Sequence, residues 1–140
     1  HNRKILLTKR IKKIMDNKIK NKKIAVLGVT FKANTDDMRE SSSLIFIPYL
    51  LKMGGIVKYY DPSGPKNEFK KNKNLKFENT LTKACLGADL IIINTEWDEF
   101  KSIDFKKLVK KNNFKIYDLR NLYNDSVMNK RNIKYYSVGR

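Results

Sequence analysis

Basic side chains occur where a nucleotide-binding loop would carry glycines. The segment AVLGVTFKANTDDMRESSS, residues 25–43, begins as an apolar run followed by Gly28, as dinucleotide-binding turns do. It lacks the two further glycines that let a backbone approach a pyrophosphate closely, and it contains Lys32 and Arg39 instead. Ammonium and guanidinium groups bind phosphate or carboxylate oxygens through charge-assisted hydrogen bonds. The loop is therefore expected to bind an anion through its side chains.

The start of the following helix is a second anion-binding element expected in this segment. A helix beginning near Ser41 would present free backbone N–H groups and the positive end of its dipole beside Lys32 and Arg39. The same spacing is equally compatible with an ordinary surface loop, in which Asp36 and Asp37 pair locally with Arg39. The residues alone leave both interpretations open.

Two further polar residues follow apolar runs that are typical of strands. Arg120, in YDLRN, is expected at the same sheet edge as Lys32, so that both cations face one anion, unless Arg120 pairs with Asp118. Asp61 follows another strand, at a position where dinucleotide-binding folds often place a ribose-binding acid. The dipeptide DP is also a common turn, and we favour the turn.

Groups that could act as nucleophiles or as acid–base catalysts are scarce. Asp98 and Glu99 could supply a general base, but we expect them to cap a short helix and the preceding Trp97 to pack at an interface. Cys85, the single cysteine, lies among apolar residues and is expected to be a buried structural thiol. The single histidine, His1, is a poor candidate base. We expect a binding site without catalytic residues and without a metal.

Apolar runs alternate with helical patterns from residue 23 onward, which predicts an α/β fold. The expected architecture is a Rossmann-like three-layer sandwich with a mostly parallel sheet, preceded by a basic amphipathic helix. Pro48 should kink or restrict the apolar helix 41–53, and the Lys- and Asn-rich stretch 66–76 should be a loop or a poor helix. The expected strands are 23–30, 56–60, 89–94, 115–119 and 134–138, and the other expected helices are 81–87, 105–111 and 126–131.

Residues 1–22 form a separate segment with the pattern of an amphipathic helix. Leu7, Ile11, Ile14, Met15 and Ile19 recur at helical spacing, and lysines occupy the opposite face. The pattern begins without a capping residue, so the segment is expected to continue a longer helix. Packing against a core or another subunit explains the apolar stripe more simply than a membrane surface or calmodulin does.

The net charge of +17, from 31 Lys and Arg against 14 Asp and Glu, makes a nucleic-acid-binding module an alternative. Most of the basic residues are Lys, with abundant Asn and Ile, a composition that an AT-rich genome favours. The lysines are spread along the chain, which counts against nucleic acid as a partner. No apolar run approaches the ~20 residues of a membrane span, and a single cysteine suits a reducing cytoplasm. We expect a cytoplasmic protein without membrane contact.

Several motifs resemble a known enzyme family. LGVTFKANTDDMRESSS, YYDP, GADLIIINTEWDEF, IYDLRNLY and the terminal YYSVGR occur in the order found in the C-terminal, UDP-binding domain of the UDP-glucose 6-dehydrogenase and GDP-mannose dehydrogenase family. TEWDEF favours the UDP-glucose branch. The resemblance implies that residues 23–140 are the UDP-sugar-binding domain. It also implies that residues 1–22 are the tail of the helical dimerisation segment of an intact homodimeric enzyme.

The resemblance also implies roles for individual residues. Phe31, Lys32 and, in the DLRN-like segment, Arg120 match family positions that bind the UDP-sugar. Arg39 matches an arginine that reaches toward NAD, a cofactor that another domain mainly binds. Cys85 does not match the motif of the family's catalytic cysteine, and the sequence lacks the GxGxxG loop as well.

The family oxidises UDP-glucose to UDP-glucuronate with two NAD, in nucleotide-sugar metabolism that feeds polysaccharide biosynthesis. The resemblance therefore implies one part of an NAD-dependent oxidoreductase, inactive as an isolated chain, which works with the rest of the dehydrogenase or with a partner chain. A non-catalytic UDP-sugar-binding subunit and a split-gene remnant are the alternatives that keep the same fold.

Overall fold

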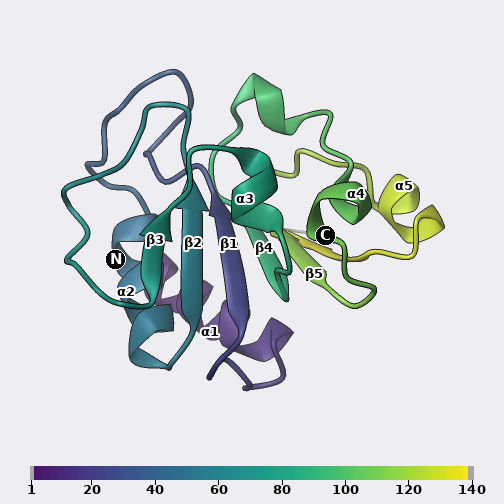
Figure 1. Cartoon of the computed structure of the whole chain (residues 1–140), viewed down its shortest axis with the longest axis horizontal. Coiled ribbons are helices and arrows are strands. Elements are labelled where there is room, and N and C mark those ends of the chain that lie inside the picture. The colour runs from purple at the N-terminus through teal and green to yellow at the C-terminus, as the bar shows by residue number, and fades with distance from the viewer. Residues whose placement is uncertain (1, 139–140) are drawn as a thin grey trace.

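A six-stranded, all-parallel sheet forms the centre of the computed structural model, which describes residues 2–138. The strand order is β3-β2-β1-β4-β5-β6 (Figure 1). Strand order reverses between β1 and β4, and ligands of open α/β sheets bind at such a switch point. The strands are β1 (Lys23–Leu27), β2 (Ile56–Tyr60), β3 (Leu75–Phe77), β4 (Leu90–Ile93), β5 (Lys115–Asp118) and β6 (Lys134–Ser137).

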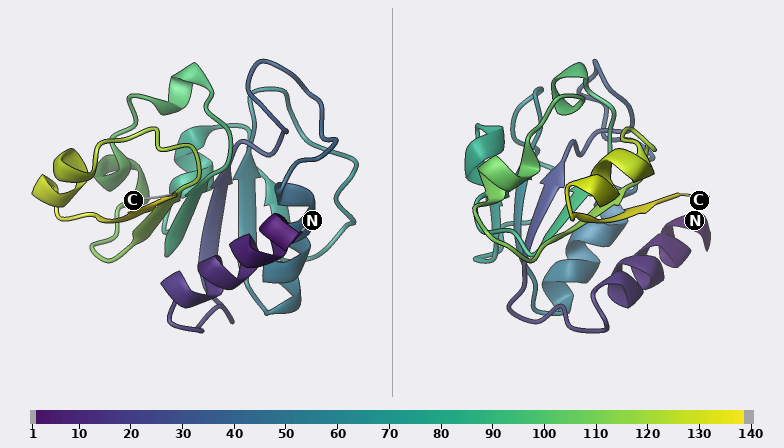
Figure 2. Two further views of the ribbon diagram at one scale, coloured as in Figure 1. Left: turned by 180° about the vertical axis from the view of Figure 1, so that it is seen from behind. Right: turned by 90° about the vertical axis from the view of Figure 1, so that its right-hand side faces the viewer.

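Helices cover both faces of the sheet, as the right panel of Figure 2 shows, with α1 and α2 on one side and α3 and α4 on the other. Alternate residues of β1 feed the two cores: Val26 lies in the cluster that contains Phe46 of α2, and Leu27 in the cluster that contains Phe105 of α4. The predicted three-layer α/β sandwich is therefore confirmed. The helices are α1 (Asn2–Ile14), α2 (Ser43–Lys52), α3 (Leu81–Cys85), α4 (Phe105–Val109) and α5 (Asp125–Lys130), with a 3₁₀ turn η1 (Asp98–Phe100).

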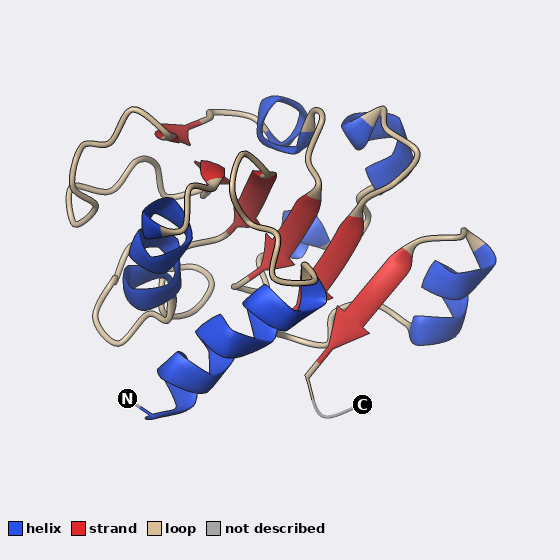
Figure 3. Cartoon of the chain, turned by 90° about the horizontal axis from the view of Figure 1, so that it is seen from below, coloured by secondary structure: helices blue, strands red, loops and turns tan. Residues whose placement is uncertain are grey.

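The first helix packs against the same core as the sheet. Seen from below, α1 lies on the opposite side of the strands from the short helices α3 and α4 (Figure 3). Ile11 and Ile14 are buried in the α2-side cluster, together with Met15 and Ile19 of the segment that follows. The Nζ atom of Lys115 donates to the carbonyl of Ile14 at 2.5 Å and so caps the end of α1. The apolar stripe predicted for this segment is thus a packing surface.

Three short helices begin at side-chain caps. Thr80 accepts from the amide of Lys83 at the start of α3, and Asp104 accepts from the amide of Lys107 at the start of α4. Asn124 accepts from two amides at the start of α5. Such caps satisfy amides that the first turn leaves without intrahelical partners, so they stabilise helices too short to form alone.

Three boundaries differ from the sequence-based expectation. The first strand ends at Leu27 rather than at residue 30, because Gly28 adopts a φ of 79° and turns the chain out of the sheet. The stretch 66–76 was expected to lack a strand, but Leu75–Phe77 pairs with β2 as an edge strand. Helix α2 runs through Pro48 as one element, and it begins at Ser43.

None of the helices within residues 2–138 has the length and apolar character that crossing a membrane requires.

Candidate functional site

The loops that follow β1, β4 and β5 meet at the carboxyl edge of the sheet, at the upper end of the strands in Figure 1. Gly28 brings the first two loops into close contact. A Cβ atom at Gly28 would lie 1.6 Å from Oγ1 of Thr95, a fully buried residue of the loop after β4. Only glycine fits at this position, so the backbone of the β1 loop is fixed directly against the switch point.

Arg120 joins all three loops. Its Nε donates to the carbonyl of Asn94, after β4, and its Nη2 donates to the carbonyl of Phe31, after β1, both at 2.9 Å. A guanidinium group carries five N–H donors, and these two bonds use two of them. The structure therefore brings the Arg120 side chain to the loop that carries Phe31 and Lys32, at the sheet edge where the sequence predicts it. The alternative pairing of its side chain with Asp118 is wrong.

Asp118 instead organises the loop after β5. Its buried carboxylate accepts the backbone amides of Arg120 at 3.0 Å and Leu122 at 2.6 Å. It also accepts the phenol of Tyr135 at 2.7 Å. These bonds position the backbone from which the Arg120 side chain extends. Asp118 thus supports the candidate site without facing it.

Phe31 and Lys32 are exposed on the loop after β1, well beyond the end of that strand. Phe31 leaves 46% of its surface exposed, so its ring is available to a ligand. Within residues 2–138, the Lys32 ammonium has no ion-pair partner. A free cation and an exposed ring next to Arg120 form a surface suited to an anionic, partly apolar ligand.

Arg39 pairs locally, as one of the two sequence interpretations held. Its Nε and Nη2 each lie 3.0 Å from a carboxylate oxygen of Asp37, a bidentate pair. Hydrogen bonds from the Arg39 side chain and backbone lower the pKa of Asp37, and the same side-chain bond raises the pKa of Arg39. The Arg39 side chain remains 90% exposed, so it projects from the loop with its charge available to a neighbouring surface.

The start of α2 does not offer the free amides that were expected there. The amide of Ser43 donates to the Ser41 hydroxyl, and those of Leu44 and Ile45 donate to carbonyls of the preceding turn. The Ser41 and Ser43 hydroxyls both donate to the carbonyl of Val29 at 2.6 Å. The serines therefore anchor the β1 loop, and an anion at this site depends on side chains.

Asp61 belongs to the structure rather than to a ribose site, so the turn interpretation is confirmed. The residue is 1% exposed, and its Oδ2 accepts the amides of Val29 at 2.7 Å and Thr30 at 3.3 Å. Its Oδ1 accepts the amide and hydroxyl of Ser63 at 2.9 and 2.5 Å. The sequence identified Asp61 as a polar residue at the end of a strand. Its contact with the β1 loop could be seen only from the parallel pairing of β1 with β2.

The acidic pair after Trp97 does not form a general base. Asp98 pairs with Lys101 at 3.0 Å, and Glu99 accepts from the hydroxyl of Tyr60 at 2.8 Å. Burial, followed by the bond to Glu99, raises the pKa of Tyr60 to about 12. Both acids lie in η1 without a side-chain cap bond, and Trp97 packs against the α4-side core. The predicted cap is thus absent, and the two acids bind different partners.

Catalytic and metal-binding groups are not found among the described residues. Cys85 is fully buried, and desolvation raises its pKa to about 12, so the thiol stays protonated and unreactive at neutral pH. Residues 2–138 contain no cluster of His, Cys, Asp and Glu that could hold a metal ion. His1 and the last two residues of the terminal YYSVGR motif lie outside the described residues.

A groove of about 560 Å³ lies away from the candidate site, between α2 and the chain before β3. Pro48 and Leu51 of α2 line one side of it, and Phe69 and Lys71 line the other. None of the predicted site residues borders this groove. The switch point therefore remains the candidate site.

Comparison with known proteins identifies the family. The chain matches the UDP binding domain of the UDP-glucose/GDP-mannose dehydrogenase family over residues 25–125. The UDP-glucose 6-dehydrogenase of Rickettsia bellii is 39% identical over 137 residues, which cover 96% of this chain and 32% of the relative. The UDP-glucose 6-dehydrogenase of Rhizobium meliloti is 38% identical over 142 residues, which cover 99% of this chain and 32% of the relative. The chain thus spans about a third of the length of these curated relatives.

Solved structures with the same fold are also dehydrogenases. NDP-N-acetyl-D-galactosaminuronic acid dehydrogenase from Methanosarcina mazei superposes with a TM-score of 0.81 at 24% identity, over 99% of this chain and 29% of that one. A UDP-glucose dehydrogenase from Pyrobaculum islandicum superposes with a TM-score of 0.67 at 21% identity, over 93% of this chain and 28% of that one. Phe31, Lys32, Arg39 and Arg120 all fall within the residues that the family model matches. The chain therefore belongs to the UDP-glucose/GDP-mannose dehydrogenase family and contains its UDP binding domain.

Proposed function

We propose that this chain is the sugar-nucleotide-binding part of a UDP-glucose 6-dehydrogenase, which oxidises UDP-glucose to UDP-glucuronate with two NAD. Relatives at 38% and 39% identity carry that enzyme's name. The observation that carries the proposal is the Arg120 guanidinium, which donates to the carbonyls of Phe31 and Asn94 and so stands at the switch point, against the loop that carries Lys32. A guanidinium group and a lysine on the loop that it contacts suit the diphosphate of UDP.

Each site residue has a distinct role in this proposal. Lys32 binds a phosphate oxygen as a point charge, and Arg120 donates from the N–H groups that its two carbonyl contacts leave free. The exposed ring of Phe31 packs against the nucleotide. These residues bind and orient the UDP group, and the reaction at the sugar takes place against the rest of the dehydrogenase.

NAD is proposed to be held mainly by another domain, with Arg39 as a contact from this one. The amides of Val29 and Thr30, which would have to bind its pyrophosphate, already donate to Asp61. The residues present therefore fit a peripheral contact through the exposed Arg39 guanidinium and do not fit a complete dinucleotide site. When bound, NAD accepts the hydride that the sugar alcohol loses. This chain alone is expected to be inactive, since its Cys85 is buried.

The assembly is proposed to be a cytoplasmic homodimer, in which residues 1–22 continue a helical dimerisation segment. Ile5 and Leu6 support this, because α1 exposes 38% and 62% of their surfaces. Apolar side chains exposed next to one another on a helix are suited to packing against a further helix. The mass of the native polypeptide, detected with an antibody to residues 23–140, separates the alternatives. A product near 16.5 kDa would favour a non-catalytic subunit or split-gene remnant.

The substitution Lys32→Ala tests the proposed site in the native full-length protein. UDP affinity, measured by calorimetry, should fall by about 1–3 kcal/mol, the scale of a hydrogen bond to a charged group. The fold should be unchanged, because Lys32 makes no ion pair within the described residues.

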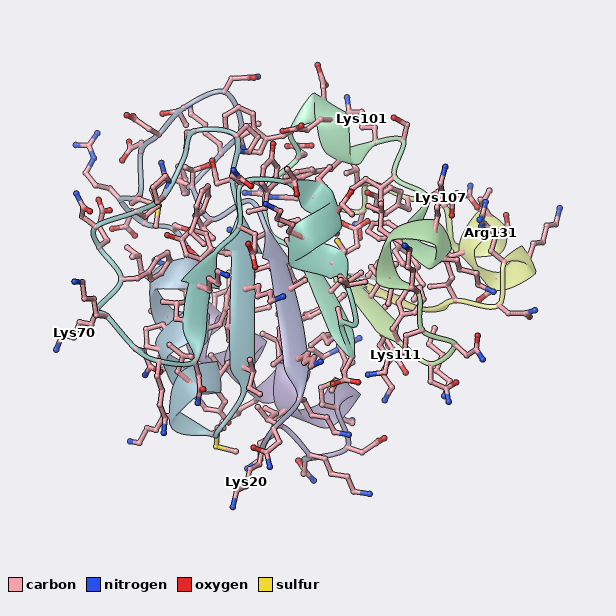
Figure 4. All side chains as sticks on the ribbon, in the orientation of Figure 1. Lys20, Lys70, Lys101, Lys107, Lys111 and Arg131 are labelled. Carbon is pink, nitrogen blue, oxygen red and sulfur yellow. The ribbon has the colours of Figure 1, made fainter. Side chains whose placement is uncertain are left out.

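The matched control is Lys70→Ala, which removes the same charge from the loop before β3, on the outer side of the molecule (Figure 4). Its UDP affinity should stay at the wild-type value. Equal losses in the two variants would mean that only the overall positive field attracts UDP, and the assignment of Lys32 would be wrong.

A further inference from the structure

The backbone amides after β1 bind an anion that the chain itself supplies. The successive amides of Val29 and Thr30 both point at Oδ2 of Asp61, at 2.7 and 3.3 Å. Successive backbone N–H groups form concave sites for phosphate, and the first strand-to-helix turn of a dinucleotide-binding domain uses them in that way. Here a buried carboxylate from the end of β2 takes the place of the phosphate.

The other side of the same peptide segment is held by the start of α2. The hydroxyls of Ser41 and Ser43 both donate to the carbonyl of Val29 at 2.6 Å. All of these groups are buried: Asp61 is 1% exposed, Ser41 2%, and Ser43 and Val29 are inaccessible to solvent. Buried hydrogen bonds in a low-dielectric environment are strong, so they fix this peptide between β2 and α2.

The hydrogen bonds continue from Thr30 to Lys32. The Thr30 hydroxyl donates to the carbonyl of Lys32 at 2.9 Å, and the amide of Phe31 donates to the carbonyl of Asp37 at 2.9 Å. Arg120 holds the carbonyl of Phe31, as described above. Hydrogen bonds thus hold the backbone at each of Val29, Thr30, Phe31 and Lys32, between the Asp61 carboxylate and the two exposed side chains.

We propose that Asp61 is a positioning residue for UDP binding, in that its carboxylate fills the anion site of the β1 loop and thereby fixes where Phe31 and Lys32 stand. This inference rests on the proposed function, because it assigns Asp61 to the UDP site through Lys32. Asp61 itself touches neither the sugar nor the nucleotide. Its effect on binding is geometric, because a shift of the β1 loop moves Phe31 and Lys32 away from the positions in which they contact the nucleotide.

A positioning role and an electrostatic role for Asp61 predict opposite changes in UDP affinity when the carboxylate is removed. A negative charge close to a phosphate site repels the ligand. If Asp61 acted only through its charge, removing that charge would therefore strengthen UDP binding. Removing the support of the loop weakens binding instead. The direction of the change in affinity therefore distinguishes the two roles without reference to its size.

The test is calorimetric titration of the native full-length protein with UDP, with thermal unfolding measured alongside. Asp61→Ala should weaken UDP binding on the order of 10- to 100-fold, as loss of one hydrogen bond between Lys32 and a phosphate oxygen would. Asp61→Asn should weaken it less, because its amide oxygen still accepts the Val29 and Thr30 amides while its charge is removed. Equal or tighter UDP binding by folded Asp61→Ala would overturn the inference.

Asp89→Ala is the matched control. Asp89 accepts the amide of Lys23 at 2.8 Å, and so ties a β1 amide to a carboxylate at the opposite end of the strand. The Asp89→Ala variant should be less stable than the wild type but should bind UDP with the same affinity. A loss as large as that of Asp61→Ala would show that general destabilisation causes the effect, and it would also overturn the inference. Absence of UDP binding by the wild type would instead refute the proposed function.

Thr30→Val provides a variant that is expected to fold even if Asp61→Ala does not. The replacement keeps the shape of the fully buried side chain and removes only the hydroxyl that donates to the carbonyl of Lys32. It should weaken UDP binding several-fold, about 2- to 10-fold, as loss of one neutral hydrogen bond does. Unchanged affinity in Thr30→Val together with Asp61→Asn would show that the loop is positioned in another way.

Discussion

Cys85 illustrates at the scale of one residue how burial removes reactivity. The thiol lies in the α4-side core, and desolvation alone raises its pKa to about 12. At pH 8 it is therefore a neutral thiol, a poor nucleophile that no solvent-borne reagent reaches. We expect iodoacetamide to leave Cys85 unmodified in the native fold and to alkylate it fully in guanidinium chloride, as seen by mass spectrometry. Rapid alkylation under native conditions would contradict this.

Residue types and spacing were sufficient to propose the cations of the candidate site but not to predict the groups that support them. Lys32 and Arg120 follow strands whose carboxyl ends must share one edge of a parallel sheet, so their proximity could be predicted. The bond from Arg120 to the carbonyl of Phe31 could not, because backbone carbonyls carry no sequence signature. The functions of Ser41 and Ser43 were missed for a related reason. Serines before a helix are typical caps, and these two reach back to Val29 instead.

At the scale of elements, the junction between β1 and β4 depends on the absence of one side chain. Gly28→Ala would combine a φ of 79° with a Cβ placed 1.6 Å from Oγ1 of the buried Thr95. The positive φ costs about 1–2 kcal/mol for an alanine, and overpacking costs about 1–3 kcal/mol more. We expect the free energy of unfolding to fall by about 2–5 kcal/mol, as measured by urea denaturation.

Gly64→Ala is the matched control for that substitution. Gly64 has a φ of 96°, yet a Cβ there would meet no atom within 4 Å. Its cost should be the backbone strain alone, about 1–2 kcal/mol. Equal losses in the two variants would mean that Thr95 moves aside easily and that the junction is not tightly packed.

Elements with a strong apolar pattern could be predicted, and marginal ones could not. The run DLIII of β4 is buried on both faces, and its apolar continuity identified it directly. The three residues of β3 stand among Lys and Asn, and only pairing with β2 makes them a strand. The first strand was predicted too long because Val29 is as apolar as the strand, although Gly28 has already turned the chain.

At the scale of the whole molecule, the positive charge is distributed rather than concentrated. Figure 4 shows its labelled basic residues at separate places around the periphery, Lys107 in α4 and the others in loops: Lys20, Lys70, Lys101, Lys111 and Arg131. A nucleic-acid interface gathers such residues on one face or along one helix. A net charge of +17 spread in this way instead creates a general positive field, which favours the approach of any anion, UDP included.

Acid should weaken the fold in part through Asp89. Burial raises the pKa of this carboxyl, but hydrogen bonds from Lys111 and from the amide of Lys23, together with nearby lysine charges, lower it by more. The folded pKa is thus below the unfolded one, so the carboxylate stabilises the fold above the unfolded value, and the contribution disappears as pH falls through the folded value. Urea denaturation should show Asp89→Asn less stable than wild type at neutral pH.

That difference should shrink as pH falls below the unfolded pKa of about 4, and it should vanish below the folded pKa. Lys111→Met serves as the partner control, since it removes the first of the two hydrogen bonds and should reduce the same pH-dependent difference. A gap between wild type and Asp89→Asn that stays constant down to pH 2 would contradict the assignment.

The position of β1 between β2 and β4 also has a consequence for synthesis of the chain. Residues 23–27 pair with residues 56–60 on one side and with residues 90–93 on the other. A ribosome makes β2 long before β4. While translation continues, the side of β1 that will pair with β4 is therefore unpaired. Non-local parallel pairing is slow, and unpaired edges associate with other chains. Chaperone protection during translation is therefore most valuable between the emergence of β2 and that of β4.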